Sequence, residues 1–347
     1  MALGQAAVEA LCVSLIFDML PMKVVPVGES FLYVGVYIGE LISSNLSVVF
    51  PNDWRATLKG VGISGFVVTL ALVLVVREPA RRREYLQLTT TSSSESKQGK
   101  SFNDGDEFVG KAIVPDTGSV VQARHFSLLG GRQGEFMASL VRIVPAFRQL
   151  SGNVFGYYMP SYLSASYPDF PNILSNYGII TGVVGTAAVL SGGFISAAYS
   201  NSKPAPPLYI AGIGGAISSI FVIFMVISPI VARTGAKGIG LLYAMQTLAY
   251  LTAEMWLGAI ATIILRLVPF RFKTVSYAIY GIINSLVYSS GTEVIGIAQA
   301  SVGADIAGTP SQQALYKRIT KIILAVIIPA GYCIAAVGFL YAHDKIC

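Results

Sequence analysis

Residues 207–229 read PLYIAGIGGAISSIFVIFMVISP, a stretch without a single charged side chain. At 1.5 Å per residue, a helix of about 20 apolar residues crosses the ~30 Å hydrocarbon core of a bilayer. The stretch is therefore expected to span a membrane as a helix.

Similar apolar runs recur along the 347-residue chain, whose mean hydropathy is +0.64. Only 12% of its residues are charged, against about 25% in soluble domains. This leaves too little polar side chain to coat a water-facing surface. We expect an all-α, multi-pass integral membrane protein surrounded by the lipid bilayer. About nine spans are predicted, near residues 2–22, 28–50, 58–77, 144–166, 173–199, 207–229, 238–266, 275–300 and 317–342.

A hydrophilic segment, residues 80–141, separates the first three expected spans from the last six. It opens with the basic run 81–83 and continues through a Ser/Thr-rich stretch at 89–96. Its apolar content is too low to build a core, so a disordered linker is predicted. Most of the Lys and Arg residues near span ends would lie on the linker's side of the membrane, which predicts that the linker is cytoplasmic.

Composition argues against several classes of function. Cys12, Cys333 and Cys347 are far apart, and His125 and His343 are the only histidines. This gives neither zinc-ligand spacing nor a Ser–His–Asp set, so no metal, no cofactor and no enzyme activity are expected. The net charge of +6 comes from basic residues at span ends and in the linker, where membrane topology accounts for them. Nucleic-acid binding is therefore not expected.

Small residues occur at spacings that let helices approach closely in lipid. Gly35 and Gly39 form one G-x-x-x-G pair, Gly178 and Gly182 form another, and Gly192–Gly193 ends the fifth expected span. We expect tight helix–helix contacts at all three places.

Local motifs, in order along the chain, carry a resemblance to a known family. The motifs are Gly4-Gln5-Ala6 with Phe17-Asp18-Met19-Leu20-Pro21, Trp54-Arg55 with Arg77-Glu78-Pro79, Gly192-Gly193-Phe194-Ile195-Ser196 with Lys203, and Glu254-Met255-Trp256-Leu257-Gly258 with Pro269 and Arg271. Together with the pattern of three spans, a linker and six spans, they resemble a major facilitator superfamily transporter, of the Spinster-like branch, that lacks its first three helices. The family's loop motif usually has an Asp where Ala197 stands.

The resemblance implies a major facilitator-type helical bundle. Residues 1–79 would be a partial N-terminal lobe of three helices, 80–141 the cytoplasmic linker, and 142–347 a C-terminal lobe of six helices. The span that contains Glu254 would then be the family's tenth helix, which lines the central cavity.

Ionisable residues inside a membrane are costly, about 2.5–3.5 kcal/mol or more, so they point to function. Glu254 is the strongest candidate. At 100° per residue, Thr247, Tyr250 and Glu254 share one polar and small stripe with Tyr243 and Gly258. A carboxyl there could bind substrate or carry protons; the alternative is a hydrogen bond that only holds helices together.

A Glu stands at the position of Gln5 in Spinster-like proteins, where it is implicated in proton coupling. Gln5 cannot take up or release a proton. Glu9 lies one turn later on the same face and could replace it, although we favour the alternative that Glu9 reaches the outer surface.

Arg148 lies at the start of an expected span that also carries Tyr157 and a kink-forming Pro160. Both residues are candidates for the substrate site, where Arg148 could bind an anionic head group. The favoured alternative is that Arg148 snorkels to the cytoplasmic surface. Glu40 and Glu293 are interpreted as structural.

The sequence thus predicts a secondary active transporter that moves a small organic or lipid-like solute by alternating access, coupled to protons as a symporter through Glu254. The Spinster-like resemblance favours a lipid or an amphipathic organic anion. The alternative is a truncated, non-transporting relative that acts as a binding or regulatory partner in the membrane.

Overall fold

The computed structural model describes residues 11–17, 19–21, 24–49, 54–75, 131–199, 205–231, 236–266 and 273–346. Within these ranges every regular element is a helix. The elements are α2 (Val25–Val49), α3 (Trp54–Val75), α6 (Gly131–Ser166), α7 (Ile173–Ala198), α8 (Ala205–Val231), α9 (Ala236–Ala253), the 3₁₀ helix η1 (Glu254–Trp256), α10 (Leu257–Arg266), α11 (Lys273–Ser301) and α12 (Pro310–Ile346).

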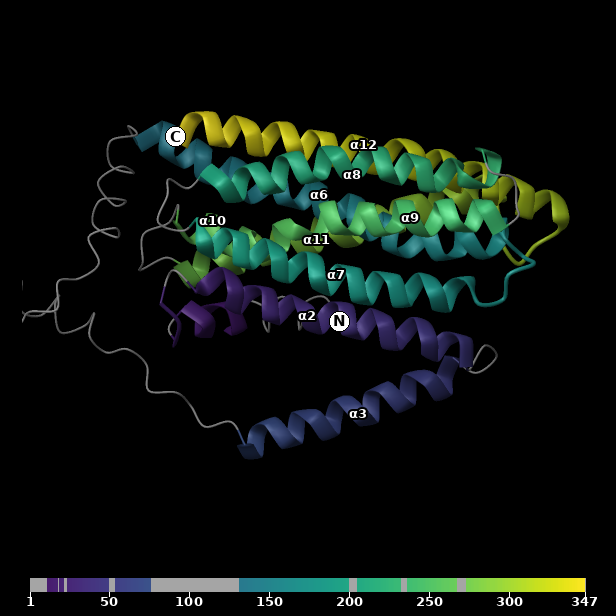
Figure 1. Ribbon diagram of the computed structural model, residues 1–347, viewed down its shortest axis with the longest axis horizontal. Helices are drawn as coiled ribbons and strands as arrows, with labels where there is room; N and C mark the ends of the chain where they lie inside the picture. Colours follow the sequence, from purple (N-terminus) through teal and green to yellow (C-terminus); the bar gives the residue numbers. More distant parts are fainter. Residues whose placement is uncertain are drawn as a thin grey trace, which may run out of the picture.

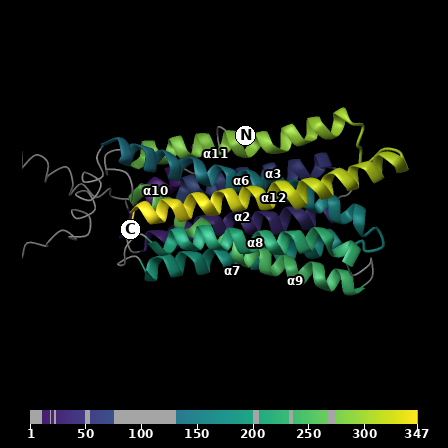
Figure 2. The ribbon, with the colours of Figure 1, turned by 90° about the horizontal axis from the view of Figure 1, so that it is seen from above.

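The helices lie side by side along the long axis of the molecule (Figures 1 and 2). α2 packs along α7, α12 packs against both α6 and α8, α11 lies on α6, and α9 lies on α8. α3 stands apart at the edge of the bundle (Figure 1), where its main contact is with α2. Every described side chain of α3 is exposed.

Many large apolar side chains are exposed on the outside of the bundle, while several polar ones are buried inside it. Phe66, Leu74 and Val337 are each about 70% exposed or more, whereas Arg148 is 2% exposed and Gln246 is fully buried. A bilayer accepts such an apolar exterior, which water does not. Four helices among the described residues are long and apolar enough to cross a membrane, over Val25–Leu46, Ile173–Ala198, Pro207–Val231 and Pro310–Ala342. The chain therefore has the features of a multi-pass membrane protein.

Most of the predicted spans coincide with helices, with two differences in their bounds. α6 begins at Gly131, inside the segment 80–141 that was assigned to the linker. The span predicted at 238–266 is not one helix, because η1 interrupts it at Glu254–Trp256. The span predicted at 2–22 lies mostly outside the described residues, although 11–17 are helical.

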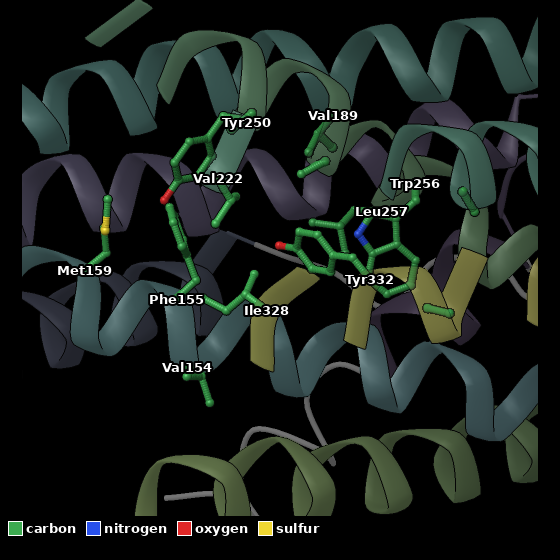
Figure 3. Close-up of a cluster of buried hydrophobic side chains, with 14 of the residues drawn as sticks. Val154, Phe155, Met159, Val189, Val222, Tyr250, Trp256, Leu257, Ile328 and Tyr332 are labelled. Atoms are coloured by element: carbon green, nitrogen blue, oxygen red, sulfur yellow. The ribbon is translucent and has the colours of Figure 1, made fainter. Parts of the chain in front are cut away.

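A buried cluster at the centre of the bundle joins helices that are distant in sequence (Figure 3). α6 contributes Val154, Phe155 and Met159 to one side of it. The Tyr250 ring of α9 meets Phe155 edge-on at 5.9 Å between ring centroids. Trp256, Leu257 and Tyr332 gather at the other end of the cluster in Figure 3. The cluster holds α6, α9, η1, α10 and α12 together around one interior.

The tight contact predicted at Gly178 and Gly182 is confirmed, and it joins α7 to α2. A Cβ atom at Gly182 would lie 2.7 Å from the Cβ of Leu41, and one at Gly178 would collide with the Ser44 side chain. Only glycine allows this approach. For Gly35 and Gly39 the prediction is wrong within the described part of the chain, because no atom there lies within 4 Å of where either Cβ would stand.

Candidate functional site

A cavity of about 850 Å³ opens between the helices. Its wall carries side chains from α2, α6, α7, α8, α9, η1, α10, α11 and α12. Among the described residues of this wall, those with a carboxyl or guanidinium group are Glu40, Arg148 and Glu254. Many of the others are tyrosines, so aromatic rings and hydroxyl groups surround the few charges.

Glu254 begins a short 3₁₀ stretch between α9 and α10, and the backbone on both sides of this stretch stays right-handed helical. The three residues from Glu254 to Trp256 adopt 3₁₀ geometry before α10 begins. α7 approaches closely at this point, because a Cβ at Gly192 would collide with the backbone carbonyl of Met255. A mid-helix stretch of 3₁₀ often marks a hinge. The expected carboxyl therefore sits in the cavity wall at a break between two helices.

The Glu254 carboxylate is held from the opposite helix. The Tyr37 hydroxyl of α2 donates a hydrogen bond to Glu254 Oε2 at 2.5 Å. The Arg148 guanidinium is also near enough for its positive charge to act on this carboxylate. Glu254 is thus bound to α2 by a hydrogen bond and to α6 by charge. Pairing of this kind offsets the cost of holding a carboxylate away from water.

Arg148 is built into the wall, and the prediction that it snorkels to the membrane surface is wrong. Its Nη1 donates to the Ala211 carbonyl of α8 at 2.7 Å, and its Nη2 donates to the Ala253 carbonyl at the end of α9. The guanidinium carbon lies 4.9 Å from the Trp256 ring centroid and 5.2 Å from that of Tyr332. One side chain therefore joins four helical elements and satisfies the carbonyl just before the break.

Glu40 was interpreted as structural, but it lines the cavity. It is exposed, and within the described residues no side chain or backbone group donates a hydrogen bond to its carboxylate. A sequence signal for this position exists. Tyr33, Tyr37, Glu40 and Ser44 recur at the helical spacing of three and four residues, and all four line the cavity. Because of Gly39, this part of α2 was expected to form a helix–helix contact, which is not found among the described residues.

A polar network closes the cavity wall between α7 and α9. The hydroxyl groups of Tyr177 and Tyr250 are 2.9 Å apart. The Gln246 Nε2 atom donates to the Tyr177 carbonyl at 2.9 Å and to Thr181 Oγ1 at 3.0 Å. Gln246 was not singled out from the sequence. It lies one turn before Tyr250, and this spacing could have identified it.

α11 forms the wall opposite α2, and α6 joins it through side-chain bonds. The Asn153 Nδ2 atom donates to the Tyr288 carbonyl at 2.7 Å, and the Tyr158 hydroxyl donates to the Thr292 carbonyl at 3.0 Å. Tyr157, a predicted site residue, is 65% exposed and lines the cavity. Glu293, also on α11, is exposed and lies outside the cavity wall.

Some of the remaining predicted site residues line the cavity, and others do not. Tyr250 and Glu254 share the cavity wall, as the stripe on α9 predicted. Thr247 does not line the cavity, since its hydroxyl donates to the Tyr243 carbonyl in its own helix. Gly258 packs against Ser30 and Gly193 instead. Gln5 and Glu9 lie outside the described residues.

The groups in the cavity wall can form hydrogen bonds and ionic contacts with a polar solute. Among the described residues no group of three or more His, Cys, Asp and Glu side chains could hold a metal ion. Two carboxyls and one buried guanidinium can bind a polar solute and can exchange a proton with it. Compared with models of known protein families and with curated protein sequences, the chain matches none.

Proposed function

We propose that this chain is a secondary transporter that moves a small organic or lipid-like solute across a membrane by alternating access. The observation that carries the proposal is the cavity of about 850 Å³, whose wall holds charged residues and tyrosines among apolar side chains, inside a bundle with an apolar exterior. Cavities of about 300–1,000 Å³ suit small-molecule ligands. We further propose that the bundle is of the major facilitator type, with a partial N-terminal lobe and a six-helix C-terminal lobe.

The break between α9 and α10 supports this mechanism. Transporters commonly bind their substrates near the bilayer midplane, beside helices that are discontinuous. Here the break at Glu254–Trp256 lies in the cavity wall, beside the buried Arg148. Rotation about this point would change the Tyr37–Glu254 bond and the Arg148–Ala253 bond together. Movement of α2 against α6, α8 and α9 would thereby be coupled to the state of the carboxyl.

We propose that Glu254 carries the coupled proton in a symport mechanism. A carboxyl held between a hydroxyl donor and a guanidinium changes its hydrogen bonding when it is protonated. Protonation would remove its attraction to Arg148 and would weaken the bond from Tyr37, which joins α2 to the broken helix. One proton can in this way alter the contact between the two sides of the cavity.

The full chain, reconstituted into liposomes with an entrapped pH dye, tests this proposal. Addition of a transported solute should carry protons inward in the wild-type protein. Glu254→Gln should abolish the proton flux, because Gln accepts the same hydrogen bond but cannot titrate. Glu293→Gln is the matched control, since this glutamate is exposed on α11 and should leave the flux unchanged. Proton-coupled uptake that persists in Glu254→Gln would contradict its role.

A second candidate is a non-transporting membrane partner. Two features favour it: α3 has only a small contact with the bundle, and the Gly35–Gly39 face of α2 is uncovered within the described part of the chain. Helix faces of this kind can associate with another membrane protein. If no member of a panel of cationic, neutral and anionic solutes produces a flux, this candidate is supported in place of transport.

A further inference from the structure

Among the described residues of the cavity wall the positive group is Arg148, and it is already bound to the protein. Arg148 is 2% exposed, and two of its nitrogen atoms donate to the Ala211 and Ala253 carbonyls. The rings of Trp256 and Tyr332 lie beside its guanidinium group. Its charge also acts on the Glu254 carboxylate. Arg148 is therefore buried and bound to two backbone carbonyls, and it offers little to an anionic ligand.

Glu40 is the remaining charged residue in the described part of the cavity wall. It is exposed to the cavity, and the ionisable side chains of the wall apart from tyrosines are Glu40, Arg148 and Glu254 alone among the described residues. The carboxylate charge that acts on Glu40 is that of Glu254, which repels it. When these three groups are ionised, two carboxylates and one guanidinium leave one negative charge in excess among the described residues of the wall, and an incoming cation would satisfy it.

Several tyrosine side chains share the cavity wall with Glu40. The charge of Glu40 acts on Tyr37 of α2, Tyr177 of α7, Tyr250 of α9 and Tyr288 of α11. All four side chains line the cavity. The face of an aromatic ring attracts a cation through its quadrupole, and ammonium ligands are commonly held this way. A carboxylate among several tyrosines is thus suited to an ammonium group.

We infer that the cavity selects an organic cation, with its ammonium group bound beside Glu40 among the tyrosines of α2, α7, α9 and α11. This inference rests on the proposed function, because it names the substrate class of the same cavity. It replaces the organic anion favoured by the family resemblance. The volume of about 850 Å³ leaves space for an apolar body attached to the ammonium group. That cation is a free amine or the ammonium head group of a lipid-like molecule.

Three ligands of nearly the same shape and different charge test the inference. They are choline, its neutral isostere 3,3-dimethylbutan-1-ol, and the anion 3,3-dimethylbutanoate. Titration calorimetry on the purified full chain in detergent should show at least tenfold tighter binding of choline than of the alcohol, with the anion weakest. A fourth ligand, hexyltrimethylammonium, distinguishes a small free amine from the head group of a lipid-like molecule. Tighter binding than choline indicates a lipid-like cation, and equal binding indicates a small free amine.

Glu40→Gln should remove the preference for choline over the alcohol, and Glu293→Gln should preserve it. Tyr288→Leu, on a different helix, should weaken choline several-fold and leave the alcohol nearly unchanged. Equal binding of choline and the alcohol by the wild-type chain, tighter binding of the anion, or no binding of any of the three would overturn the inference. The order in which the wild-type protein binds the cation, the neutral alcohol and the anion decides the inference even if a variant does not fold.

The result is separable from that of the transport test. Selective cation binding without solute-driven flux would keep the inference and would refute transport. Flux of a neutral or anionic solute without any preference for the cation would keep transport and would refute the inference.

Discussion

Replacement of Arg148 by methionine should destabilise the protein strongly. Methionine has a similar length and can keep the apolar contacts of the side chain with Trp256 and Tyr332. It cannot donate to the Ala211 and Ala253 carbonyls, and it leaves Glu254 without its positive neighbour. The substitution thus removes the polar function of Arg148 while it changes the packing little.

The magnitude follows from these contacts. Two hydrogen bonds from a charged donor contribute about 1.5–3 kcal/mol each, and the unsatisfied carbonyls add to their loss. The two cation–π contacts contribute on the order of 0.5–1 kcal/mol each. We therefore expect the free energy of unfolding to fall by at least about 3–5 kcal/mol, which is the usual cost of removing one partner of a buried charge pair.

Unfolding of the detergent-solubilised chain in increasing SDS, followed by circular dichroism, measures this loss. Arg318→Met is the matched control, because this arginine is exposed on α12 and its replacement should change the free energy of unfolding by less than about 0.5 kcal/mol. The double variant Arg148→Met/Glu254→Gln should recover at least about 1 kcal/mol, since it also removes the uncompensated carboxylate. An Arg148→Met protein as stable as the wild type would refute the placement of Arg148 in the wall.

Two further changes test the packing around the cavity by the same unfolding measurement. Gly182→Ala should lower the free energy of unfolding by about 1–3 kcal/mol, because the added Cβ would lie 2.7 Å from Leu41 Cβ and 3.2 Å from the Tyr37 carbonyl. Gly39→Ala is the control and should not destabilise the protein, because its added Cβ meets nothing within 4 Å. An equal loss of stability in both variants would contradict the α2–α7 contact. Tyr37→Phe keeps the buried ring and removes the donor to Glu254, so it should lower the free energy of unfolding by about 1–2 kcal/mol. Tyr199→Phe is the control, because this tyrosine is 53% exposed and its replacement should leave the stability unchanged. No loss of stability in Tyr37→Phe would argue against the bond to Glu254.

Much of the fold was predictable from the sequence because lipid imposes a strict condition on the backbone. Inside a bilayer the amide and carbonyl groups must bond within their own segment, which only a helix of sufficient length allows. Uncharged runs such as 207–229 and 173–199 therefore coincide with α8 and α7. The same one-dimensional periodicity grouped Tyr250 with Glu254, and both line the cavity, but it also grouped Thr247 with them, which does not.

The surroundings of Arg148 and Glu40 were decided only by the tertiary structure. Arg148 is held by carbonyls at positions 211 and 253, which no spacing within its own helix could indicate. Glu40 faces the cavity on a side of α2 whose neighbours Tyr37 and Ser44 also meet the glycines of α7. A periodic pattern tells which residues share a face of a helix, but the neighbour that covers this face comes from elsewhere in the chain. For that reason the sequence determined the helices and the kind of solvent around them, and the packing of the helices determined which charges are balanced.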